Sequence, residues 1–322
     1  MPLATLCLAL FVPSAAADTT LARKFVVKEK LAYTVHSHLT AEERQQGLLT
    51  WIPSDVDIDY PFSYTVEALK ADGFAQIKYL RPTWTVTEGE TSDSVPKPKI
   101  DKLNQVLQIL VSPVNELTEV KDITPKKKPV KKKPTLQFAR RGAAPVQAPI
   151  FGEYVGEVHR LALFVGGIDS SLDFAPKLPL EAVKIGDTWK RTIGYQPQKL
   201  KGKDGKSAVQ RLDYVYSYVG PMMVDGKPIL RVQAKLDFST DLVEYLKSIA
   251  ANQDFGIRTM PLNLKATIDF DLDPKTRHTL HATAVSEGGF KFLLKGQDDA
   301  YEEERFKGQT DLTLAGRKIG AK

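Results

Sequence analysis

Residues 262–272, with the sequence LNLKATIDFDL, alternate apolar and polar side chains along the whole stretch. Because successive side chains of a strand point to opposite faces, we expect Ile268 to face a dry side and Asp269 a wet side. Residues 230–238, LRVQAKLDF, carry the same pattern. Such alternation is typical of antiparallel strands with one buried and one solvated face. It predicts a mainly β protein, a β-rich α+β fold. We expect one or two curved antiparallel sheets. One form that such a sheet can take is an open half-barrel covered by one or two helices.

Two turn signals divide further strands into hairpins. Asp72-Gly73 separates a strand carrying Phe62, Tyr64 and Val66 on one face from a strand over residues 74–80. Asp225-Gly226 separates residues 209–219 from residues 229–238. Asp-Gly between alternating segments favours a tight hairpin turn. Other expected strands lie at residues 189–195, 279–285, 289–295 and 305–315, and one begins near Phe25 and continues through Leu31, Tyr33 and Val35.

The N-terminus has the features of an export signal. Residues 3–12 are apolar and are followed by Ala15-x-Ala17, a small-residue cleavage site. We expect residues 1–17 to be removed and the mature chain to begin near Asp18; the alternative is a buried N-terminal strand or helix. The only cysteine, Cys7, lies in this segment, so the mature chain would have no disulfide, no thiolate metal site and no thiol catalysis. No later apolar run is long enough to span a membrane.

The positive charge is concentrated in one short tract. The chain has 45 Lys and Arg against 39 Asp and Glu, and the excess of 45 − 39 = 6 equals the number of lysines in this tract: Lys126, Lys127, Lys128, Lys131, Lys132 and Lys133. A nucleic-acid-binding fold would spread such residues over a face, so nucleic acid is not an expected partner. The tract predicts either a solvated linker or a contact with an anionic envelope surface.

Composition divides the mature chain into three parts. Residues 18–90 form an N-terminal β region, residues 91–150 a connector rich in Pro and Lys, and residues 151–322 a C-terminal β region. Within the connector, Leu103, Val106, Leu107, Leu110 and Val111 recur at helical spacing and predict a short helix ended by Pro113. Helical spacing recurs from residue 158 to residue 172, but the adjacent glycines 166 and 167 favour a strand ending near residue 165. A short helix is expected at residues 242–249.

The residue patterns contain no catalytic or cofactor signature. There is no Gly-x-Ser-x-Gly elbow, and the loop at residues 202–207 lacks the first glycine of a phosphate-binding loop. His36 and His38 share one face of a predicted strand, and His278 and His281 lie near a turn. A metal site joining these four histidines is one hypothesis, but without cysteines or a helix-borne motif, solvated or half-buried imidazoles are the expectation. We therefore predict a protein that is not an enzyme and needs no cofactor.

One segment resembles a known family. Residues 178–189, LPLEAVKIGDTW, resemble a Leu-Pro … Val-x-x-Gly-Asp-Ser/Thr-Trp segment of uncharacterised, exported, β-rich bacterial proteins, and the resemblance extends over residues 176–319. That family has no assigned activity and so implies no site residues. We expect Gly186-Asp187 to form a tight turn and Trp189 a buried anchor at a strand start. The predicted curved sheet is also similar, at the level of fold alone, to the open half-barrels of envelope lipoprotein carriers, which bind acyl chains on their concave face.

These expectations lead to a binding function. We predict an exported protein, periplasmic or at the cell surface, that holds a hydrophobic ligand or another envelope component on a curved sheet. The runner-up is a structural or interaction module with a filled core, and the third hypothesis is a hydrolase. The residues expected to face a ligand are the aromatic ones at alternating strand positions: Tyr214, Tyr216, Tyr218, Phe238, Phe270, Phe290 and Phe292.

Overall fold

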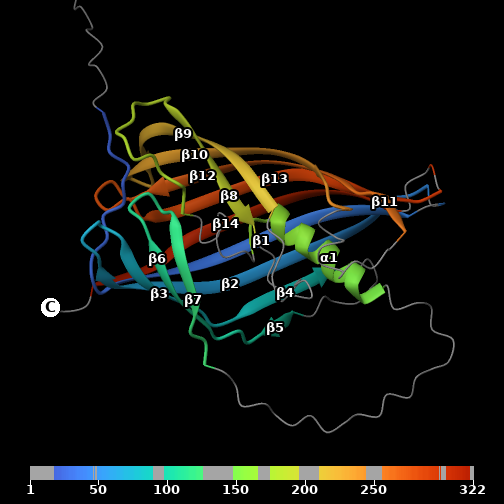
Figure 1. The fold of residues 1–322 in the computed structure, drawn as a ribbon, viewed down its shortest axis with the longest axis horizontal. Coiled ribbons are helices and arrows are strands. Elements are labelled where there is room, and N and C mark those ends of the chain that lie inside the picture. Colours follow the sequence, from blue (N-terminus) through green and yellow to red (C-terminus); the bar gives the residue numbers. More distant parts are fainter. Residues whose placement is uncertain are drawn as a thin grey trace, which may run out of the picture.

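The structure, a computed structural model, describes residues 18–45, 47, 49–89, 98–125, 148–165, 175–195, 210–243, 256–296, 298 and 302–319. They form one large, curved, antiparallel sheet that is not closed and one helix, α1 (Ala148–Ala162), as the alternation predicts (Figure 1). The strands are β1 (Glu29–Gln45), β2 (Ile52–Leu69), β3 (Ala75–Arg81), β4 (Trp84–Gly89), β5 (Lys99–Asp101), β6 (Gln105–Val111), β7 (Leu117–Asp122), β8 (Thr188–Tyr195), β9 (Gln210–Val224), β10 (Lys227–Asp241), β11 (Ile257–Thr259), β12 (Pro261–Leu272), β13 (Thr279–Leu294) and β14 (Glu302–Ile319).

The first and last strands of the chain meet in the middle of this sheet. The strand order is β7-β6-β3-β2-β1-β14-β13-β12-β10-β9-β8, with β4 paired to β2 and β5, and β11 paired to β13. β1 and β14 pair along their full length, from Glu29 opposite Ile319 to Gln45 opposite Glu302. The N-terminal and C-terminal β regions therefore belong to a single sheet, and the Asp-Gly hairpins β2–β3 and β9–β10 form as expected.

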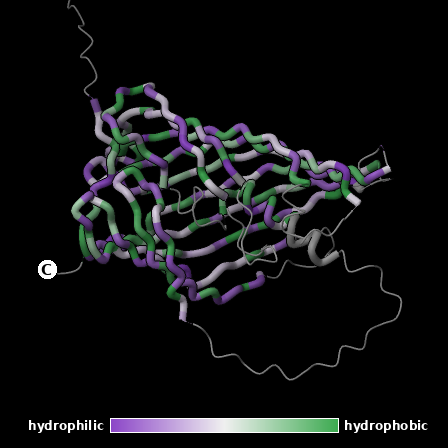
Figure 2. Tube along the Cα trace, viewed as in Figure 1, coloured by the Kyte–Doolittle hydropathy of each residue, from purple (hydrophilic) through white to green (hydrophobic). Residues whose placement is uncertain are grey.

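Each long strand separates apolar from polar side chains, and Figure 2 shows this alternation along the strands. We call the face that carries the buried side chains the inner face and the opposite one the outer face. In β12, Ile268 is 1% exposed on the inner face, and Asp269 lies on the outer face, where its carboxylate accepts a hydrogen bond from Gln233 (2.9 Å). The predicted facing of this strand is confirmed.

A pair of glycines allows close contact where β13 lies between its two neighbours. A Cβ atom on Gly288 would come within 2.2 Å of the Asn263 carbonyl oxygen on β12, and one on Gly289 within 2.4 Å of the Glu304 carbonyl oxygen on β14. Only residues without a Cβ allow the backbones to approach this closely. Residues 279–285 and 289–295, expected as separate strands, form the single strand β13, which passes through this pair without a break.

The helix predicted from Leu103 to Val111 is wrong: residues 105–111 form strand β6. The apolar positions that suggested helical spacing include Leu107 and Val111, which are buried on the inner face because β6 pairs with both β3 and β7. Pairing on both sides satisfies the backbone and overrides a short local pattern. Among the described residues of the connector, 98–125 therefore contribute strands β5, β6 and β7 to the sheet.

The strand predicted to end near Val165 is also wrong: residues 148–162 form α1. The objection to a helix was the glycine pair 166–167, but α1 ends at Ala162, before the glycines, so their helix-breaking cost does not apply.

Several predictions lie outside the described residues. They concern the signal segment 1–17, the lysine tract of residues 126–133 and most of the helix expected at 242–249. Leu242 and Val243 are described, and both are buried.

Candidate functional site

The inner face gathers the aromatic side chains that the sequence predicts to face a ligand. Tyr214, Tyr216 and Tyr218 on β9, Phe270 on β12, and Phe290 and Phe292 on β13 are each at most 1% exposed. Phe238 on β10 is half-buried against the same core. The structure thus brings all seven residues to one face from four strands. Their contact with a ligand stays a prediction.

These aromatic side chains pack against each other and against the segments that border the sheet. Phe290 and Phe292 meet edge to face with ring centroids 5.3 Å apart. Trp189, at the start of β8, stacks on Tyr216 at 5.7 Å and donates its indole hydrogen to the Lys177 carbonyl oxygen (2.7 Å). Trp189 is a half-buried anchor at a strand start, close to the role expected for it.

Helix α1 covers part of the inner face (Figure 1). Val158, Leu161 and Ala162, at most 4% exposed, follow helical spacing and point away from solvent. On one side of the helix, Tyr195 of β8 donates a hydrogen bond to the buried carboxylate of Glu157 (3.4 Å). Since β8 is the last strand of the sheet order, this contact ties α1 to one edge of the sheet.

Two hydroxyl groups of the inner face hold the C-terminal end of α1. Ser286 on β13 donates a hydrogen bond to the Ala162 carbonyl oxygen (2.6 Å), and Thr310 on β14 donates one to the Leu163 carbonyl oxygen (2.8 Å). These carbonyls have no partner within the helix, so the hydroxyls satisfy them. Gly308 makes room for this contact, because a Cβ there would lie 2.7 Å from the Ser286 oxygen and 3.0 Å from Leu163.

The turn that ends α1 is strained. The Val165 amide bonds to the Arg160 carbonyl (2.9 Å) and the Phe164 amide to the Leu161 carbonyl (3.0 Å), which is the Schellman pattern of helix termination. Its left-handed position is normally glycine, but here it is Phe164 with φ of 57°. The buried Phe164 ring meets Tyr214 edge to face at 6.5 Å. Packing of this ring into the core offsets the backbone strain.

A buried contact between His159 and Glu304 joins α1 to β14. His159 Nε2 lies 2.5 Å from Glu304 Oε1, with the side chains 13% and 3% exposed. Glu302 and Glu43 flank Glu304 on the inner face. Burial, with help from the charges of Glu43 and Glu304, raises the pKa of Glu302 to about 7. This part of the inner face therefore holds acidic groups next to Phe290, which pairs with Glu304 across the strands.

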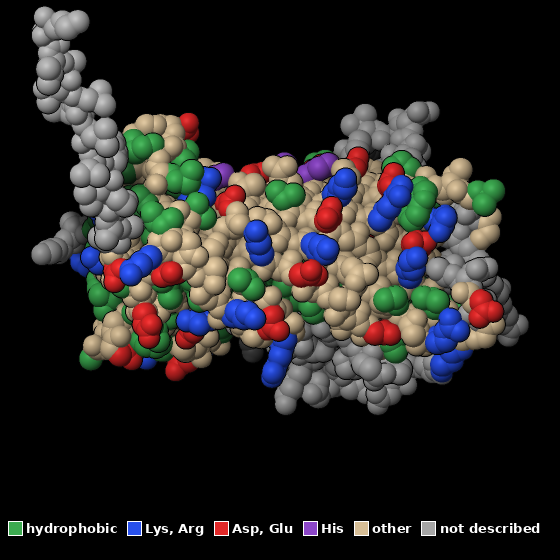
Figure 3. Space-filling model, turned by 90° about the horizontal axis from the view of Figure 1, so that it is seen from above, with side chains coloured by type: hydrophobic (Ala, Val, Ile, Leu, Met, Phe, Trp, Pro, Cys, Tyr) green, Lys and Arg blue, Asp and Glu red, His purple; other side chains and the backbone are tan. Residues whose placement is uncertain are grey.

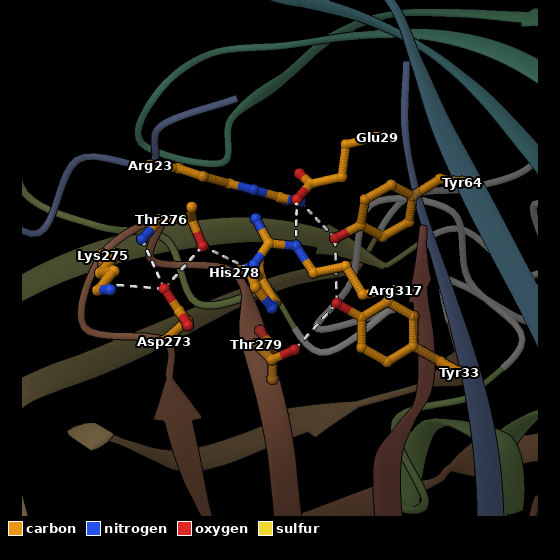
Figure 4. Close-up of polar contacts among 10 residues, drawn as sticks. All are labelled: Arg23, Glu29, Tyr33, Tyr64, Asp273, Lys275, Thr276, His278, Thr279 and Arg317. Carbon is orange, nitrogen blue, oxygen red and sulfur yellow. Dashed lines mark hydrogen bonds and ion pairs between the residues drawn. The ribbon is translucent and has the colours of Figure 1, made fainter. Parts of the chain in front are cut away.

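A polar cluster lies at the other end of the inner face (Figure 4). Arg23, 7% exposed, donates a hydrogen bond to the Tyr64 hydroxyl and lies over its ring. The Tyr33 hydroxyl lies 3.2 Å from the Tyr64 hydroxyl and donates its hydrogen to the Thr279 carbonyl oxygen (2.9 Å). Burial raises the pKa of Tyr33. Beside them, the fully buried Glu29 pairs with Arg317 (2.7 Å). These bonds join the segment before β1 to β1, β2, β13 and β14.

His278 belongs to the same cluster. Thr276 donates a hydrogen bond to Asp273 (2.9 Å) and its oxygen lies 2.5 Å from His278 Nδ1, which fixes the turn between β12 and β13. His278 is 2% exposed, and burial, with the nearby Arg23 charge, lowers its pKa to about 4. The imidazole is therefore neutral at neutral pH. Among the described residues its Nε2 has no hydrogen-bond partner.

The two edges of the sheet are bridged at the end where this cluster lies, although β7 and β8 do not pair. The segment before β1 bonds through Thr19 to Val183 near β8 and through the Arg23 amide to the Pro113 carbonyl near β6 (2.7 Å). The Leu178 amide also bonds to the Val114 carbonyl (3.0 Å). The sheet is thus tied across at this end by segments without strand structure.

The outer face carries mixed charge. Two adjoining troughs of about 820 and 740 Å³ cross it and share the side chains of Lys265, Glu287 and Lys307. On the face seen in Figure 3, basic and acidic side chains are interspersed without a large patch of one sign. This distribution is typical of a solvated sheet surface.

The four histidines weighed as metal ligands do not meet. His278 is buried in the polar cluster, whereas His281 lies on the outer face, 3.8 Å from Asp271. His36 and His38 lie together on β1, each beside an aspartate of β2. Within the described residues, no group of three or more His, Cys, Asp or Glu side chains could hold a metal ion. No helix among these residues is long and apolar enough to cross a membrane.

Sequence reasoning missed the residues that hold α1. Ser286, Glu304 and Thr310 are polar side chains at inner-face positions of otherwise alternating strands. A polar residue in the apolar phase of a strand needs a buried partner, so this irregularity was the available signal.

Comparisons with known proteins give little more. No family model matches the chain, and no curated protein matches it. Among solved structures, one titled "Lipid-protein interactions in lipovitellin" is similar over 92% of this chain with 9% sequence identity and a TM-score of 0.43. This chain covers 26% of the length of that one.

Proposed function

We propose that this chain is a non-catalytic, exported protein of the cell envelope that binds a hydrophobic ligand on the inner face of its sheet. One observation carries the proposal: the inner face is apolar across an open, curved sheet of eleven consecutive strands, and α1 covers part of it through apolar packing and a few polar bonds. Curved, mostly apolar surfaces with a few placed polar groups are typical of sites for apolar ligands.

A ligand of acyl-chain size can replace part of the apolar contact that α1 makes with the inner face. Burial of Val158 and Leu161 contributes up to about 3 kcal/mol each, and a ligand with about ten buried methylene groups would contribute about 8 kcal/mol. Leu163, Phe164 and Val165 at the end of α1 are buried as well, so such a ligand replaces part of the contact rather than all of it. The polar residues around Glu304 would lie near one end of such a ligand.

The first test is native mass spectrometry of the chain purified from its own envelope without detergent. A mass excess that is released on denaturation supports the proposal and gives the ligand class. The second test is displacement of a fluorescent fatty acid in Phe238→Asp, which places a charge on the inner face, and in Val215→Asp, the matched change on the outer face of the neighbouring strand. We expect only the first variant to lose binding.

A second candidate is a structural or interaction module with a filled core. The observation that favours it is the complete burial of six of the seven inner aromatic residues. An apo mass, together with no uptake of the fluorescent fatty acid by the unmodified chain, would overturn the ligand proposal and favour this one.

A further inference from the structure

The histidines of β1 and the aspartates of β2 form two matched pairs on the outer face. His36 Nδ1 lies 2.7 Å from Asp59 Oδ1, and His38 Nδ1 lies 2.7 Å from Asp57 Oδ1. The strand register places each histidine directly opposite its aspartate. The imidazoles are accessible, because the side chains of His36 and His38 are 60% and 44% exposed. The same geometry thus occurs twice, two residues apart.

Each aspartate determines which imidazole nitrogen is available. A carboxylate only accepts hydrogen bonds, so a neutral His36 or His38 carries its hydrogen on Nδ1 and keeps a lone pair on Nε2. A carboxylate bonded to the far ring nitrogen is the usual support of a metal-binding histidine, since it fixes the tautomer and raises the basicity of the other nitrogen. Asp59 and Asp57 already provide this support.

The spacing places both imidazoles on the same face of β1. Residues 36 and 38 lie on the same face of a strand with Cα atoms about 7 Å apart, within the joint reach of two imidazoles. Asp311 of β14 lies opposite His36, but its two carboxylate oxygens accept hydrogen bonds from Thr283 (3.1 Å) and Gln309 (2.9 Å), so it is not counted among the ligands. Two imidazoles with open positions for water suit the late first-row divalent cations.

We propose that His36 and His38 form an open metal site that binds Zn²⁺ or Cu²⁺, with Asp59 and Asp57 as positioning residues. The site has two protein nitrogen ligands, and water supplies the others. It lies on the outer face, opposite the surface proposed to bind a hydrophobic ligand. The two proposals are therefore independent, and either can fail without the other.

The test uses the full chain, free of any histidine tag and stripped with chelator, titrated with zinc chloride by calorimetry at pH 8. The alkaline pH limits competition from protons, because the hydrogen bond to Asp59 raises the pKa of His36. We expect one ion per chain. Loss of either imidazole, in His36→Asn or His38→Asn, should weaken binding by at least about tenfold, and Asp59→Asn or Asp57→Asn by about 10- to 100-fold.

His281→Asn is the matched control, because His281 is also a half-exposed outer-face histidine near an aspartate. It should bind zinc as the unmodified chain does. Copper bound to the unmodified chain should show two nitrogen ligands by electron paramagnetic resonance, and the double variant His36→Asn/His38→Asn should lose this signature. The proposal is overturned if the unmodified chain takes up no zinc, or if the double variant binds both metals unchanged.

Discussion

The attachment of α1 can be weakened without disturbing the sheet. Thr310→Val keeps the side-chain shape but removes the hydroxyl that donates to the Leu163 carbonyl at 2.8 Å, and Ser286→Ala removes the donor to the Ala162 carbonyl at 2.6 Å. A buried carbonyl that loses its donor costs about 1–3 kcal/mol. Because these carbonyls regain water when the helix lifts, we expect this cost to favour local opening of α1.

Hydrogen exchange measured by mass spectrometry reports the change in the free energy of opening of α1 directly. Since 1.4 kcal/mol corresponds to a tenfold change, each single variant should lower the protection of α1 by about 5- to 150-fold, while peptides of β12 keep theirs. Thr267→Val, on the outer face of β12, is the control and should leave α1 unchanged. Equal protection of α1 in all variants, or a parallel loss across the whole sheet, would refute the view that α1 is a separately opening cover.

Three further predictions concern stability, each read from urea unfolding. Ile268→Asp should cost more than about 4 kcal/mol because it buries a charge, whereas Asp269→Ala should cost less than about 1 kcal/mol; similar losses would mean that the facing of β12 is wrong. Gly288→Ala should destabilise by several kcal/mol, since its Cβ would meet the carbonyl oxygen of β12 at 2.2 Å, and a neutral result would contradict the close approach of these strands. The pKa of His278 is about 4 in the folded chain and 6.5 in the unfolded chain, so its contribution to the free energy of unfolding is fully present above pH 6.5 and decreases by about 3 kcal/mol as the pH falls toward 4. The variant His278→Gln should flatten that decrease. An unchanged pH profile would argue against a buried neutral imidazole.

The aromatic face could be predicted because alternation is a property of the strand itself. Tyr214 and Tyr216 are two residues apart, so they must share a face wherever their strand pairs. Where a short stretch fits both the helical and the strand period, the sequence does not decide between a helix and a strand. Residues 105–111 form β6 because they pair with β3 on one side and β7 on the other. Residues 148–162 form α1, which ends before the glycines at 166 and 167 that argued against a helix.

The residues around α1 could not be assigned from the sequence. Ser286 and Thr310 are 124 and 147 residues away from the carbonyls that they satisfy, and His159 is 145 residues from Glu304. Nothing in the local pattern indicates which distant segment supplies a partner. The same holds for the pairing of His36 with Asp59, which depends on the register between β1 and β2.

The sequence by itself determined the class of the protein, the hairpins at Asp72-Gly73 and Asp225-Gly226, and the side of each long strand that is dry. These features depend on residues near one another in the chain, so periodicity reports them. Only the tertiary structure decided that both β regions form one sheet, that α1 lies over its inner face, and which polar groups meet there. Those outcomes depend on contacts such as that of Glu29 with Ile319, whose cost in chain entropy is offset only when the whole sheet forms.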